Sequence, residues 1–134
     1  MAEEGVSMRE ILFRGKRLDN GEWVLGDLHH RGREVVITSF YTKTYATVDP
    51  ATVGQFTGLD DKNGRRIFEG DLCLCDRHIN DSFDKTVFEI SFDPLRGYYG
   101  ESNWGNEFDA DSFEMCEVIG NIHDNHELLE GGQT

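Results

Sequence analysis

The sequence predicts a mainly β protein, β-rich α+β at most, with no more than short helical turns. Glycine is abundant (15 residues) and proline scarce (2), and turn signals recur every 10 to 15 residues, a rhythm typical of short strands. The segment KTVFEISFD alternates with a two-residue period, so Phe88, Ile90 and Phe92 share one face of a strand. A chain of 134 residues is long enough to bury one modest core.

Three strands are expected in an N-terminal β region, residues 8–48. The candidates are EILFRGKR, EWVLGDL and REVVITSFY, the last of which is rich in β-branched and aromatic residues. Asn20-Gly21 turns the chain between the first two, because Asn and Gly tolerate the positive φ that tight hairpins require. Residues 1–7 are expected to form a flexible leader.

A second region, residues 49–129, begins at Asp49-Pro50, since the residue before proline is held out of helical geometry. The stretch VGQFTGLDDKNGRRIFEGDLC predicts two strands joined by a hairpin at Asn63-Gly64. DLCLCD, KTVFEISFD and FEMCEVIGNI predict three further strands, with a loop from Gly100 to Asp111. HDNHELLE predicts one helical turn, and residues 130–134 a flexible tail.

We infer by analogy that the strands of this second region close into a barrel. Glu69-Gly70-Asp71-Leu72 leads into an alternating strand that is followed by a strand pair, which is similar to the start of a small SH3-like barrel. We therefore expect a small antiparallel barrel in the C-terminal part, next to an N-terminal β-hairpin region, with both regions in one compact unit.

The charge is strongly acidic. Thirteen basic and 26 acidic residues give a formal charge of −13, and no Lys or Arg follows Arg96. Such a surface repels phosphate backbones, so direct nucleic-acid binding is not expected, and any partner should be basic. No apolar run approaches the ~20 residues of a membrane span, and the acidic N-terminus does not resemble an export signal.

Three cysteines, Cys73, Cys75 and Cys116, are an odd number in a chain of this length. This indicates a reducing, cytoplasmic setting rather than a disulfide framework. A zinc site combining them with His78, His123 or His126 is conceivable, but a Cys-x-Cys pair on a strand does not wrap a metal easily. Small buried hydrophobic side chains are the more common outcome. We therefore predict no metal and no cofactor.

The residues Asp60, Asp61, Lys62 and Asn63 beside Gly64 invite a test for a ligand loop. The spacing of an EF-hand fails, because Leu59 and Gly70 fall at positions that require side-chain oxygens. The phosphate loop Gly-x-x-x-x-Gly-Lys-[Ser/Thr] also fails, because Arg65 and Arg66 follow Gly64. Turn chemistry remains, with the aspartates bonding to local backbone. No nucleophile framework is present either, so we predict no catalytic residues.

Four aromatic residues are the candidate interaction surface: Tyr98, Tyr99, Trp104 and Phe108. Lying among Gly and Asn, they are typical of an adaptable recognition surface, or else they plug one end of a barrel. Asp109, Asp111, Glu114 and Glu117 form an acidic stripe near the last strand. We expect this stripe to be a solvent-exposed surface, and the alternative is that its paired carboxylates carry out acid–base chemistry.

Three long motifs carry a family resemblance. VGQFTGLDDKNGRRIFEGDL, MREILFRGKR and VIGNIHDNHELL closely resemble the YopX family of phage and prophage proteins, over Met8 to about Leu129. One departure is His126, where the family commonly has proline. The resemblance implies a phage or prophage protein that acts inside the bacterial host, and it supplies no activity or catalytic residues.

The function expected from these observations is that of a phage accessory protein, a non-catalytic module for protein binding or assembly in the host cytoplasm. Its partner would be a host or phage protein, and a homo-oligomer is plausible because small strand-rich domains expose edges. Two alternatives stay open. One is a metal-dependent or hydrolytic enzyme, and the other is an acidic mimic of nucleic acid that occupies a DNA-binding protein.

Overall fold

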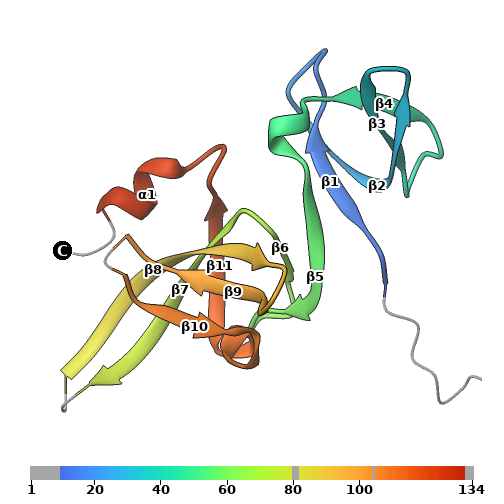
Figure 1. Ribbon diagram of the computed structural model, residues 1–134. Helices are drawn as coiled ribbons and strands as arrows, with labels where there is room; N and C mark the ends of the chain where they lie inside the picture. The colour runs from blue at the N-terminus through green and yellow to red at the C-terminus, as the bar shows by residue number, and fades with distance from the viewer. Residues whose placement is uncertain (1–9, 80–81, 104, 132–134) are drawn as a thin grey trace, which may run out of the picture. The chain divides into compact units, whose positions relative to one another are not determined.

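The computed structural model describes residues 10–79, 82–103 and 105–131 (Figure 1). The chain divides into two compact units, residues 1–58 and 59–134. The expected leader, residues 1–7, lies outside the described residues, and of the expected tail only residues 130–131 are described, as the end of the last helix. Asp49-Pro50 begins a short 3-10 helix, in which Asp49 Oδ1 accepts a hydrogen bond from Ala51 N.

The first unit contains four antiparallel strands, a 3-10 helix and the start of a fifth strand: β1 (Phe13–Lys16), β2 (Trp23–Arg31), β3 (Glu34–Ser39), β4 (Tyr45–Val48), η1 (Pro50–Thr52) and β5 (Gly54–Asp60). The three strands expected here are confirmed, and Gly21 has the positive φ of 75° that the first turn requires. Backbone hydrogen bonds from Leu18 N to Thr47 O and from Asp49 N to Lys16 O also join the end of β1 to β4.

Two glycines allow the close packing of this first unit. A Cβ on Gly15 would lie 3.2 Å from the side chains of Ile37 and Val48, which belong to the buried core. A Cβ on Gly26 would lie 1.7 Å from the carbonyl oxygen of Thr38, on the neighbouring strand β3. At Gly26 the neighbouring backbone leaves no room for a side chain, whereas at Gly15 the two neighbouring side chains would have to shift slightly.

The second unit holds the end of β5 and the remaining elements: β6 (Arg66–Phe68), β7 (Asp71–Ile79), β8 (Ser82–Asp93), β9 (Gly97–Glu101), β10 (Glu107–Asp109), η2 (Ala110–Met115), β11 (Cys116–Asn121) and α1 (His126–Gly131). The hairpin at Asn63-Gly64, the strands around DLCLCD and KTVFEISFD, and the terminal helical turn are confirmed. The stretch from Gly100 to Asp111, expected as a loop, instead contains β10 and the start of η2.

Both sheets are antiparallel. Their strand orders are β4-β3-β2-β1-β5-β6 and β10-β9-β8-β7-β11. The prediction of a mainly β protein is confirmed, but the expected barrel is wrong, because neither sheet is closed. The reason is topological: β10 and β11 end the second sheet on opposite sides, and they do not pair with each other.

One face of the second sheet forms the core. Cross-strand pairs place Cys73 opposite Phe88 and Val118, so these side chains share a face with Ile90. The buried cluster consists of Ile67, Cys73, Cys75, Phe88, Ile90, Phe113, Cys116 and Val118. Phe108 covers the edge of this cluster from β10, opposite Gly100, where a Cβ would lie 2.5 Å from the Phe108 ring.

The opposite face of the same sheet brings like charges together. Glu89 of β8 pairs directly with Glu101 of β9 and with Leu72 of β7. Burial raises the pKa of Glu89, and the negative charges of Glu101 and Glu69 raise it further. A raised pKa means that Glu89 favours the folded state when it is protonated and opposes it when it is ionised.

Replacing Glu89 with glutamine should therefore stabilise the protein at pH 7 by about 0.5–1 kcal/mol, because like charges that face each other across a sheet are destabilising. The gain should shrink as the pH falls through the raised pKa of Glu89, and it should vanish below the ordinary pKa of Glu, where wild-type Glu89 is also neutral. Urea unfolding at pH 7 and at acid pH measures this difference. Glu127→Gln, on the exposed surface of α1, is the control and should change stability little at either pH.

Candidate functional site

The second unit contains an acidic cleft. It has a volume of about 670 Å³, and it lies between the β5–β6 turn and η2. The residues that line it are Leu59, Asp60, Asp61, Lys62, Gly64, Ala110, Asp111 and Glu114. The structure thus brings together the turn at Asn63-Gly64 and part of the acidic stripe, which are about fifty residues apart in the sequence.

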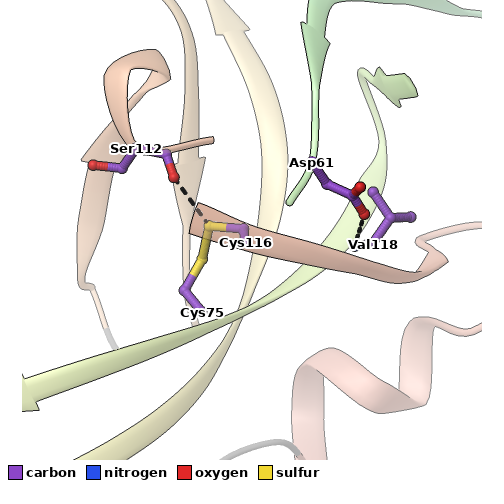
Figure 2. The surroundings of a disulfide bond; sticks show 5 residues. All are labelled: Asp61, Cys75, Ser112, Cys116 and Val118. Carbon is purple, nitrogen blue, oxygen red and sulfur yellow. Dashed lines mark hydrogen bonds between the residues drawn. A yellow bond between two sulfur atoms is a disulfide. The ribbon is translucent and has the colours of Figure 1, made fainter. Parts of the chain in front are cut away.

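The turn wall is organised by Asp61, whose side chain is buried (5% exposed). Oδ1 accepts hydrogen bonds from Asn63 N at 2.8 Å and from Arg65 N at 2.9 Å. Oδ2 accepts one from Val118 N at 2.9 Å, and Figure 2 shows this last bond. Gly64 completes the turn with a φ of 83°. The sequence predicted the local bonds, whereas the bond to β11 depends on tertiary structure. Asp61 therefore fastens the turn to the start of β11.

The pKa of Asp61 reflects two opposing effects. Burial raises the pKa, but the backbone N–H groups of Val118, Arg65 and Asn63 lower it by more, so that it lies below the ordinary value for aspartate. Asp61 is consequently a structural carboxylate that stays ionised inside the fold. The exposed carboxylates of the cleft are Asp60, Asp111 and Glu114.

The second wall is η2, which is anchored by one side chain. Phe113 is buried and packs edge-on against Phe108, with the ring centroids 5.8 Å apart. Cys116 N donates a hydrogen bond to Phe113 O and so ends the helix. Because Phe113 points into the core, Asp111 and Glu114 are left on the cleft side of this short helix.

A disulfide between Cys75 and Cys116 lies behind this wall (Figure 2). The expectation that the cysteines form no disulfide is therefore wrong for this pair. Strand register is the physical reason: Cys116 lies directly opposite Cys75, with their Cα atoms 4.6 Å apart, whereas Cys73 lies opposite Val118. Cys73 keeps its thiol and is buried in the same core.

Three of the four aromatic residues proposed from the sequence are described, and each has a different aromatic or cationic neighbour. Phe108 packs against Phe88, with ring centroids 4.5 Å apart, and Tyr98 packs against the exposed Phe92 at 5.0 Å. Both contact the core cluster. The guanidinium carbon of Arg96 lies over the ring of Tyr99, 4.3 Å from the centroid of that ring. Trp104 lies outside the described residues.

A different aromatic group, in the first unit, was missed by the sequence analysis. Phe40 and Tyr41 form an edge-on pair at the tip of the β3–β4 hairpin, with ring centroids 5.5 Å apart, and Tyr41 is 71% exposed. Trp23 and Tyr41 help to line a smaller cavity of about 240 Å³ beside this tip. The polar run Thr42-Lys43-Thr44, directly after these two rings, could have indicated a turn at this end of the strand.

The chemistry available to the cleft is that of carboxylates. Within the described residues, no three His, Cys, Asp or Glu side chains gather as a metal site would require. No helix of the described chain is long and apolar enough to cross a membrane. The cleft presents three exposed negative charges and one exposed positive charge, Lys62, beside two apolar side chains, Leu59 and Ala110.

These features define a class of protein: a mainly β chain of two antiparallel sheets, whose second unit carries an acidic cleft beside a disulfide-linked strand. The chain belongs to the YopX family, because the family model described as YopX protein matches residues 6–130. This match confirms the resemblance carried by the three motifs.

The fold is shared with a solved structure. The crystal structure of protein EF1440 from Enterococcus faecalis aligns with 91% of this chain and 99% of its own, with a TM-score of 0.54 and 24% sequence identity. At this identity the likeness concerns the fold alone. No curated protein matches the chain.

Proposed function

We propose that the chain is a non-catalytic protein-binding module whose acidic cleft takes a lysine- or arginine-rich segment of a partner protein. The observation that carries this proposal is the convergence of Asp60, Asp111 and Glu114 on one 670 Å³ cleft from two separate segments. Lys62 also lines the cleft, but three exposed carboxylates outnumber this one ammonium group, and the resulting excess of negative charge attracts the opposite charge. Leu59 and Ala110 supply apolar contacts for the methylene stems of lysine and arginine.

The uneven distribution of charge supports the same partner chemistry. Residues 59–134 carry six basic and 18 acidic residues, a formal charge of −12, whereas residues 1–58 carry seven and eight. Nearly the whole excess of negative charge therefore belongs to the unit that holds the cleft. This charge disfavours nucleic acid and favours a basic protein segment.

The biological setting proposed for this module follows from the family. We take it to be a phage or prophage accessory protein that meets a host or phage protein in the bacterial cytoplasm. Self-association is part of the same proposal, because the edge strands β10 and β11 can pair with another chain. A strictly monomeric mass by light scattering at high concentration would count against self-association.

Reversing one charge of the cleft, by Asp111→Lys or Glu114→Lys, should weaken binding of a short arginine- and lysine-rich peptide about five- to tenfold at low salt. The reason is that each substitution removes an attraction and adds a repulsion inside the cleft. Titration calorimetry with the full chain measures the affinity. Binding should also weaken as salt is added, because the exposed charges are screened.

Glu127→Lys is the matched control, since it makes the same change in net charge on exposed α1 and does not line the cleft. It should weaken binding about twofold or less. If all three variants lost affinity equally, the peptide would be responding to net charge, and the cleft would be the wrong site. If wild type did not bind the peptide at all, the proposed function would be rejected.

A further inference from the structure

We propose that the Cys75–Cys116 disulfide is a redox-controlled lock on η2, so that the cleft wall is held in place in the oxidised protein and loosens when a dithiol reduces the bond. The conformational part of this inference stands on the second unit alone. Its consequence for binding rests on the function proposed above.

The position of the bond makes η2 the element that it controls. Cys116 is both the residue that ends η2 and the first residue of β11. β11 is an edge strand that pairs only with β7 in the sheet, and its pairing is irregular between Val118 and Gly120. Cys75, in contrast, belongs to β7, which is held on its other side by a long pairing with β8. On its other side Cys116 is held by a single backbone bond, from Lys62 N to Cys116 O, so we expect the Cys116 side to move more than the Cys75 side.

Reduction requires a movement. Reduction breaks the covalent bond, and two sulfur atoms that are no longer bonded repel each other at close range. The two thiols must therefore separate inside a closely packed cluster that also contains Cys73 and Phe113. Because Phe113 anchors η2, a shift of Cys116 is passed directly to the wall that carries Asp111 and Glu114.

The fold also offers a hydrogen-bond acceptor to the reduced Cys116 thiol. The carbonyl oxygen of Ser112 lies 3.4 Å from Cys116 Sγ (Figure 2). A disulfide sulfur has no hydrogen to donate, but a Cys116 thiol could donate its S–H to this carbonyl. Lys62 N still donates to Cys116 O at 2.9 Å, and Val118 N still donates to Asp61. Opening the bond is thus expected to loosen η2 without unfolding the unit.

The chemistry is thiol–disulfide exchange. A dithiol attacks one sulfur of the Cys75–Cys116 bond, forms a mixed disulfide, and then closes on itself. The dithiol is oxidised to a cyclic disulfide. Its two electrons and two protons pass to Cys75 and Cys116, which become thiols. Since Cys75 and Cys116 are only 4% and 1% exposed, attack on either sulfur requires a local opening of the fold first. Cys73 cannot substitute without backbone movement, because its cross-strand partner is Val118.

The test compares the full-length protein, oxidised with glutathione disulfide, with the same protein reduced by dithiothreitol, and alkylation and mass measurement establish the thiol count of each form. Hydrogen exchange should show that amide protection in residues 110–118 falls about tenfold or more on reduction, while residues 86–93 of β8 change little. Unchanged protection in residues 110–118, or failure of the disulfide to form, would overturn the proposal.

Two variants sharpen the test. Cys73→Ala keeps the disulfide pair and should respond to dithiothreitol as wild type does. Cys75→Ala/Cys116→Ala should show the low protection with or without the reductant. If the double variant does not fold, the comparison of wild type with Cys73→Ala still decides. Loss of the response in Cys73→Ala would show that the redox effect depends on Cys73 and not on the Cys75–Cys116 bond, and the proposal would be rejected.

Binding of the arginine- and lysine-rich peptide to both redox forms separates this inference from the proposed function. The oxidised form is expected to bind about three- to tenfold more tightly, the range set by tightening one ordered wall of a binding site. If η2 loosens on reduction but neither form binds the peptide, the lock stands and the cleft's function is rejected. If the peptide binds both forms equally while protection in η2 is also unchanged, the lock is rejected and the function stands.

Discussion

Replacing Asp61 by alanine should destabilise the second unit by about 3 kcal/mol. The substitution removes the acceptor of three backbone N–H groups, and it leaves the Val118 N–H without this acceptor inside the protein. A buried donor that loses its acceptor costs far more than the net value of an average hydrogen bond. Urea unfolding followed by circular dichroism measures the change, and exchange of the Val118 amide should report it locally.

The neighbouring Asp60→Ala is the control, because Asp60 is exposed and has the same chemistry. It should change stability by no more than about 0.5 kcal/mol. Equal costs for the two variants would show that the turn tolerates loss of either carboxylate, and that Asp61 is not the residue that fastens it to β11.

The effect of Asp61 should depend on pH. Its pKa is lowered in the fold, so its contribution to stability is present above the ordinary aspartate pKa and is lost as the pH falls through the lowered value. The wild type and Asp61→Ala should therefore differ most near neutral pH and converge in strong acid. A difference that grew on acidification would contradict the assignment of an ionised, hydrogen-bonded Asp61.

Replacing Gly26 by alanine should destabilise the first unit by about 3 kcal/mol or more, at the upper end of the range for overpacked sites. The added Cβ would lie 1.7 Å from Thr38 O and 3.0 Å from Phe40 N, both backbone atoms of the neighbouring segment. Backbone held in the β2–β3 pairing cannot rotate away as a side chain can. Thermal unfolding of the full chain, followed by calorimetry, measures the loss.

Gly15→Ala is the matched variant in the same sheet. Its Cβ would lie 3.2 Å from atoms of the Ile37 and Val48 side chains, which can adjust by small rotations. Its cost should be about 1 kcal/mol, clearly below that of Gly26→Ala. The reverse order would mean that the β2–β3 segment adapts more easily than the core of the first unit.

The elements that sequence patterns located are those defined by local chemistry. Alternation at Phe88 and Ile90 and the turn at Asn63-Gly64 depend on residues close together in the chain, and both are where the sequence placed them. Local sequence patterns could not predict whether the sheet closes into a barrel. Closure depends on whether the two outer strands meet, and no local pattern records which strands lie at the edges of a sheet.

The disulfide and the cleft escaped sequence reasoning for a related reason. Cys75 and Cys116 are separated by 41 residues, and only the register of β11 on β7 selects Cys75 rather than Cys73. The cleft likewise needs the turn at Gly64 and the carboxylates of η2 to converge from distant segments. Asp61 illustrates both cases, since two of its bonds are local and predicted, and the third, to Val118, is not.

The pairing of Gly100 with Phe108 has a consequence for how YopX sequences can vary. The Phe108 ring occupies the space where a side chain of residue 100 would lie, so the two positions share one volume. A relative that carries a larger residue at the first position is expected to carry a smaller one at the second. Such coupled substitution, in which one position compensates for the other, would indicate the β9–β10 contact from sequences alone.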